Sequence, residues 1–118
     1  MPHGHDVPNR DLLDDIARGF DQDPDVAVGT MFRSPGLRVG GKIFAFLGTL
    51  GKLIVKLPRD RAAQLVNEGT AERVVMGTRT MREWVEVPAG EDHASTVSLW
   101  AALADEAHQH VDALRTSS

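Results

Sequence analysis

The chain has 118 residues, of which 42% are hydrophobic, and its 13 Lys and Arg against 17 Asp and Glu give a net charge of -4 at pH 7. A chain of this length buries one hydrophobic core, so a single domain is expected. The absence of cysteine excludes disulfides, thiolate metal sites and cysteine nucleophiles. No apolar run approaches the roughly 18 to 20 residues of a membrane span and no secretory signal is recognisable, so we expect a cytoplasmic protein without membrane contact.

Residues 1–8 are predicted to form a disordered lead. An amphipathic helix follows, because apolar residues recur at helical spacing as far as Phe20. Asn9 or Asp11 begins this helix and caps its N-terminus. The acidic residues on the other face have no basic or metal partner nearby in the sequence, and we interpret them as a solvated surface.

The next stretch, Met31 to Leu57, combines strand formers with turn glycines and predicts a three-stranded antiparallel meander. Gly40 and Gly41 supply the two positive-φ positions of a tight hairpin, and a second reversal spans Gly48 to Gly51. The three predicted strands are 26–39, with a kink or bulge at Ser34-Pro35-Gly36 that indicates an edge or a bend, then 42–47 and 52–57.

The strand 42–47 is apolar on both faces. Side chains alternate along a strand, so Ile43, Ala45 and Leu47 are predicted to point one way and Phe44 and Phe46 the other. A sheet with helices on one side would leave the second of these faces in water. We therefore expect a cover for it, which is the last helix of the chain, a second copy in a homodimer, a protein partner or a ligand.

A second helix is predicted from Pro58 to Gly69, since proline suits a first helical turn and glycine a helix end. The free N–H groups at its start lie beside Lys56, Arg59 and Arg61, which is a serviceable anion site. Any helix that begins with arginines shares this feature, and the chain has no glycine-rich nucleotide-binding loop.

Two further strands, 71–76 and 81–87, are predicted as a second hairpin. Trp84 lies on the same face as Arg82, between charged neighbours. It is either a packed residue whose long charged neighbours reach past it to water or an exposed stacking platform.

The last predicted helix runs from Thr96 to Leu114 and is capped by Ser95 or Thr96, with residues 116–118 as a tail. His108 and His110 are two residues apart and therefore face different directions on a helix. We interpret both as surface histidines, since neither has a partner at metal-ligand spacing.

Charge is distributed unevenly along the chain. Residues 1–32 carry a net charge of -5, residues 33–82 carry +7 and residues 83–118 carry -6. Either the acidic flanks neutralise the basic middle across the tertiary fold, or the basic middle forms a surface for a phosphate-bearing or acidic partner.

The elements together predict an α+β domain of two layers, a five-stranded antiparallel sheet with helices in the order α-β-β-β-α-β-β-α. Several short segments of the sequence resemble the TfoX N-terminal domain family and the related YjbR-like (MmcQ) proteins. The resemblance covers about residues 10–112 and thus most of a single domain predicted to span 9–115. The segments are Met31-Phe32, Ser34-Pro35-Gly36-Leu37, Gly40-Gly41-Lys42-Ile43-Phe44-Ala45, Lys56-Leu57-Pro58, Met81-Arg82-Glu83-Trp84-Val85, Trp100, Leu103-Ala104 and Glu106-Ala107. Arg33 departs from the Met-Phe-Gly pattern that is usual in the family.

This resemblance implies a stand-alone, non-enzymatic interaction or regulatory module with no assigned catalytic residue, cofactor or metal. The partner would be a protein, such as a transcription factor, or a second copy of the chain. Direct nucleic-acid binding is the first alternative, although the pI near 5.6 and the lack of a nucleic-acid motif oppose it. A small-molecule-binding protein or enzyme is the second. The candidate partner- or anion-binding residues are Lys42, Phe44, Phe46, Lys52, Lys56, Arg59, Arg61, Arg82 and Trp84.

Overall fold

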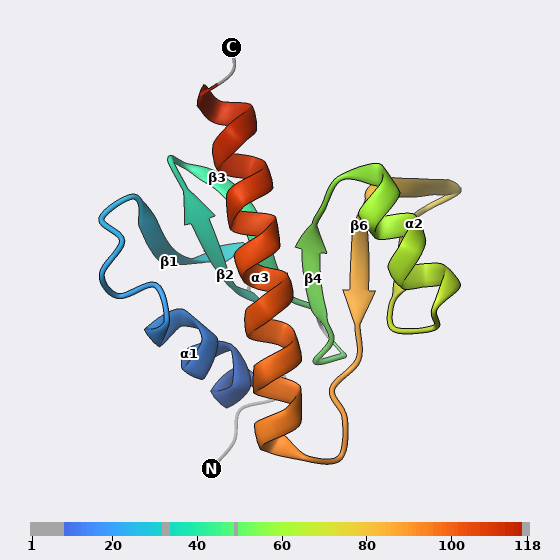
Figure 1. The fold of residues 1–118 in the computed structure, drawn as a ribbon, viewed down its shortest axis with the longest axis horizontal. Coiled ribbons are helices and arrows are strands. Elements are labelled where there is room, and N and C mark those ends of the chain that lie inside the picture. The colour runs from blue at the N-terminus through green and yellow to red at the C-terminus, as the bar shows by residue number, and fades with distance from the viewer. Residues whose placement is uncertain (1–8, 32–33, 49, 117–118) are drawn as a thin grey trace.

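The computed structural model describes residues 9–31, 34–48 and 50–116. The predicted disordered lead, and Phe32 and Arg33 of the segment compared with the family pattern, lie outside the described residues. Three helices accompany a six-stranded open antiparallel sheet of strand order β1-β2-β3-β4-β6-β5 (Figure 1). The elements are α1 (Arg10–Arg18), β1 (Val26–Met31), β2 (Ser34–Val39), β3 (Lys42–Leu47), β4 (Leu53–Lys56), α2 (Arg59–Asn67), β5 (Glu72–Met76), β6 (Arg79–Val87) and α3 (His93–Thr116).

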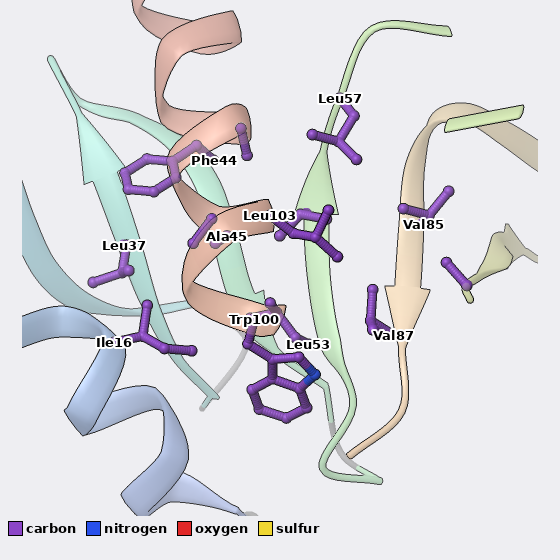
Figure 2. Close-up of a cluster of buried hydrophobic side chains, with 14 of the residues drawn as sticks. Ile16, Leu37, Phe44, Ala45, Leu53, Leu57, Val85, Val87, Trp100 and Leu103 are labelled. Carbon is purple, nitrogen blue, oxygen red and sulfur yellow. The ribbon is translucent and has the colours of Figure 1, made fainter. Parts of the chain in front are cut away.

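The helices form one layer and the sheet the other, which confirms the predicted two-layer α+β architecture. Figure 1 shows α3 running across the middle of the sheet, with α1 and α2 on either side of it. All three helices contribute to a single core cluster with the inward residues of the strands, among them Leu37, Ala45, Leu53 and Val85 (Figure 2). Because α3 lies on the same side as α1 and α2, the expectation that the last helix covers the second face of β3 is wrong.

The predicted strand 26–39 is two strands. β1 and β2 pair antiparallel from Val26↔Val39 to Met31↔Ser34, so the chain reverses between Met31 and Ser34 and forms a hairpin. The kink or bulge predicted at Ser34-Pro35-Gly36 is wrong, because these residues lie inside β2 in continuous pairing with β1. The hairpin raises the predicted five strands to six. β2 is a central strand, yet Pro35 is tolerated because the ladder with β3 begins only at Gly36↔Phe46, one residue later.

β3 has the predicted bounds but not the predicted alternation. Leu37 pairs with Ala45 while the next residue, Arg38, pairs with Ile43, so Phe44 is the extra residue of a β-bulge. Phe44 therefore joins Ala45 on the helix side, where it is fully buried (Figure 2). The prediction that Phe44 shares a face with Phe46 is wrong.

The face of the sheet opposite the helices is nevertheless partly apolar. Phe46 pairs with Ile54 across β3 and β4, and its ring meets the ring of Trp84 edge-on at 5.7 Å. Ile54 is 9% exposed, whereas Phe46 and Trp84 are half-buried. No helix within the described ranges covers this face, which we call the outer face.

The predicted helix caps are confirmed in part. Asn9 is the N-cap of α1 as predicted, but its side chain makes no capping hydrogen bond and its amide instead donates to the Gly51 carbonyl at 2.9 Å, tying α1 to the β3–β4 turn. α3 starts at His93, and Asp92 is its cap, because the Asp92 carboxylate accepts from the Ser95 backbone N–H at 2.9 Å. The predicted cap at Ser95 or Thr96 is therefore wrong by three or four residues. Among the described residues, no helix has both the length and the apolar character needed to cross a bilayer.

Candidate functional site

Three adjoining hollows lie along β6, the first two at the start of α2 and the third beside β3, β4 and the end of α3. They measure about 310, 380 and 360 Å³ and share lining residues. Lys56 and Trp84 belong to both the first and the third hollow, and Arg59 and Arg82 belong to both the first and the second. Their basic side chains form what we call the cationic surface, composed of Lys42, Lys56, Arg59, Arg73 and Arg82 around Trp84.

Strand pairing positions these side chains. Lys56 at the end of β4 pairs with Trp84 of β6, and the Leu57 N–H donates to the Glu83 carbonyl at 2.8 Å, which holds the end of β4 against β6. Pro58, with φ of -55°, is the N-cap of α2, which begins at the next residue. Arg59 is therefore carried to the same corner as Trp84 by consecutive local steps.

The basic side chains of this corner are short of carboxylate partners. Glu83 lies 4.0 Å from the Lys56 ammonium. Within the described part of the chain, no carboxylate lies at ion-pair distance from Arg59, Arg73 or Arg82, and the same holds for Lys42. Arg73 makes one contact, from its guanidinium to the Arg82 carbonyl at 3.5 Å. Among the described residues, four of the five cations thus have no carboxylate at ion-pair distance, and Lys56 has Glu83.

Two predicted site residues are engaged elsewhere. Lys52 lies 3.4 Å from Glu86 and 3.5 Å from Glu72, and these carboxylates, Glu86 foremost, raise its pKa. Arg61 donates to both oxygens of Glu106 at 2.8 and 3.1 Å, which ties α2 to α3 and raises the pKa of the guanidinium. Neither side chain contributes to the cationic surface.

The remaining predicted residues divide clearly. The cationic surface brings together Lys42, Lys56, Arg59, Arg82 and Trp84, with Phe46 in contact with Trp84 on the outer face. Phe44 lies in the core and has no place in it. Arg73 was not predicted as a site residue, because only the β5–β6 pairing brings it opposite Val85. The predicted hairpin of 71–76 and 81–87 was the signal that could have located it.

The histidines of α3 correct another prediction. His108 and His110 are mostly buried, with 15% and 17% of their side chains exposed. The His108 ring lies 5.3 Å from those of Phe20 and Phe44, and its Nε2 is 3.1 Å from an Asp23 carboxylate oxygen. His110 Nε2 lies 3.6 Å from Glu83. Both side chains are thus packed against other parts of the fold, and the prediction that they are surface histidines is wrong.

The side chains at this corner indicate what it could bind. Among the described residues, no group of three His, Asp or Glu side chains is placed to hold a metal ion. What the corner offers is several cations beside an apolar floor, a combination that attracts an anionic ligand with an apolar part.

Comparison with known proteins adds a family. The sequence model of the YjbR family matches residues 22–110. The chain belongs to the YjbR family. The match contains β1 to β6, α2 and most of α3, so the cationic surface lies entirely within the part of the chain that this YjbR protein shares with its family. No curated protein and no solved structure matches the chain.

Proposed function

We propose that this YjbR protein is a non-enzymatic interaction module that binds an acidic segment of a protein partner on the cationic surface. The observation that carries the proposal is the gathering of five basic side chains, including Arg59 and Arg82, at one corner of a chain whose net charge is -4. Like charges kept close together without partners repel one another, so a role in binding accounts for their placement.

The apolar lining defines the partner further. The third hollow combines Lys42 and Lys56 with Ile43, Trp84 and Val111. Exposed ion pairs contribute only about 0 to 1 kcal/mol each, so cations alone give weak binding. An apolar side chain inserted beside Trp84 would supply the remaining affinity. The ligand that fits is therefore a segment in which acidic residues flank an apolar one.

Single-stranded nucleic acid is the competing ligand, since it also combines anions with rings that stack on tryptophan. Two features disfavour it. Trp84 is half-buried and already in contact with Phe46, which limits the ring face available for a base. A long phosphate backbone leaving the corner would also meet the acidic residues of α1 and α3, such as Asp14 and Asp105, both exposed.

The test is fluorescence anisotropy with a labelled peptide of alternating glutamate and leucine, compared with labelled oligothymidine of similar length. We expect the peptide to bind, with an affinity that falls with salt, and Arg59→Glu/Arg82→Glu to weaken it at least about tenfold. Arg10→Glu/Arg38→Glu, with the same change in net charge but outside the hollows, is the matched control and should bind nearly as the natural chain does. Binding of oligothymidine in preference to the peptide, or equal losses in both variants, would overturn the proposal.

A further inference from the structure

The two edges of the sheet differ in how they are protected. β5, at one edge, carries the charged residues Glu72 and Arg73 and has a register shift between Arg73 and Val75. Both devices discourage the addition of another strand. β1, at the other edge, reads VAVGTM without charge or proline, and its pairing with β2 is continuous from Val26 to Met31. Among the described residues, β1 is therefore a regular edge that lacks these protective devices.

The outward backbone groups of β1 follow from its pairing. Gly40 N–H donates to the Asp25 carbonyl at 3.1 Å, so that Asp25 and Gly40 form a hydrogen-bonded pair. Hydrogen-bonded and non-hydrogen-bonded pairs alternate in an antiparallel ladder. The backbones of Val26, Val28 and Thr30 consequently point away from β2. The Val26 N–H is already bonded to the Asp23 carbonyl at 3.2 Å. Within the part of the chain that the structure describes, this leaves the Val26 carbonyl and both groups of Val28 and Thr30 for a neighbour.

These groups are self-complementary about Val28. If a second β1 lies antiparallel with Val28 opposite its own copy, each Val28 N–H reaches the other Val28 carbonyl. In the same register each Thr30 N–H reaches the Val26 carbonyl of the other copy, so every outward group except the Thr30 carbonyl has a partner. Opposed residues share a face, so the two Val28 side chains, each 63% exposed, come into contact. The match is isologous and closes as a dimer.

We propose that two copies of this chain pair through β1, forming a dimer with one continuous sheet across a twofold axis. Strand pairing alone buries less surface than the roughly 1,200 Å² typical of stable complexes, so the dimer dissociates on dilution. The cationic surface takes its residues from β3, β4, β5, β6 and α2 and none from the edge strand β1, so it stays accessible in the dimer. The dimer and the binding of an acidic segment can therefore fail independently.

Sedimentation equilibrium over a wide range of chain concentrations tests the dimer. The natural chain should shift from 12.8 kDa toward twice that mass as concentration rises. Val28→Lys, which introduces an edge charge, should remain a monomer. Val75→Lys is the matched control, since Val75 is 59% exposed on the opposite edge strand and the charge change is identical; it should associate like the natural chain.

Amide hydrogen exchange gives a second readout that needs no variant. Protection of the Val28 and Thr30 amides should increase with chain concentration, while that of residues in β5 should not. A mass that stays at 12.8 kDa at every concentration would overturn the dimer. So would an association that Val28→Lys leaves intact, or protection of Val28 that is independent of concentration, since the edge would then be covered within one chain.

Discussion

Asp92 shows how one residue fixes the start of the longest helix. Its carboxylate accepts from both the Ser95 hydroxyl and the Ser95 N–H, and these hydrogen bonds lower its pKa. A carboxyl with a lowered folded-state pKa stabilises the fold above its unfolded pKa of about 3.9, and this contribution is lost as the pH falls through the folded-state pKa. The cap should therefore stabilise α3 at neutral pH and fail in acid.

We expect Asp92→Ala to lower the melting temperature at pH 7 by a few degrees, because the first turn of α3 loses its acceptor. Asp92→Asn keeps an acceptor oxygen and should stay close to the natural chain. Thermal unfolding followed by circular dichroism from pH 7 to pH 3 measures both. The gap between the natural chain and Asp92→Ala should shrink below about pH 4, whereas the gap between the Asn and Ala variants should persist. A gap to the natural chain that stays constant to pH 3 would contradict the role of the charge.

Among the secondary-structure elements, β3 decides which side chains enter the core. The bulge places Phe44 among the core residues with no exposed surface, while Phe46, two positions later, remains half-exposed on the outer face. Phe44→Ala should reduce the free energy of unfolding by about 3 to 5 kcal/mol because it leaves a cavity. Phe46→Ala should cost about 1 to 2 kcal/mol, since it loses partial burial and the contact with Trp84. Urea unfolding of both variants measures the difference, and equal losses would argue against the bulge.

The strands also show which features of the fold can be predicted from local sequence signals and which cannot. The hairpin at Gly40 and Gly41 was predictable because both residues adopt positive φ, 57° and 83°, which glycine allows. The reversal between β1 and β2 has no such glycine pair, so 26–39 reads as one strand. The bulge at Phe44 was equally hidden, because one extra residue leaves an apolar run apolar and only the partner strand reveals the shift.

The site was predictable to the extent that it is local. Lys56 and Arg59 are close in the sequence, as are Arg82 and Trp84, and each pair lies at a predicted strand or helix end. The pairing of β4 with β6, which joins the two pairs, is not local. The pairing of Arg61 with Glu106 joins residues 45 positions apart, and no local pattern indicates which helix lies opposite. The burial of His108 likewise depends on contacts outside its own helix, such as the ring of Phe44. Contacts between distant segments therefore account for most of the wrong assignments.

Over the whole molecule, charges are neutralised at some places and left concentrated at another. Lys52 and Arg61 are paired with carboxylates, so the acidic flanks do neutralise part of the basic middle. The cationic surface keeps its charge, and Arg59 also stands in the first turn of α2, where the helix dipole disfavours a cation. A cluster of this kind lowers the stability of the folded chain, a cost that the proposed binding role would explain.

This separation predicts opposite signs for two kinds of neutralising variant. Arg59→Gln/Arg82→Gln removes repulsion at the cationic surface and should stabilise the chain by on the order of 0.5 kcal/mol at low salt. Lys52→Gln removes a cation that attracts Glu72 and Glu86, and should lower the melting temperature under the same conditions. Both effects should diminish in about 0.5 M NaCl, where the Debye length is short compared with the spacing of exposed charges. Thermal unfolding at the two ionic strengths measures this. If neutralising Arg59 and Arg82 destabilises the chain at low salt, these cations stabilise the fold through other groups. That result would contradict the proposal that they are kept together for binding.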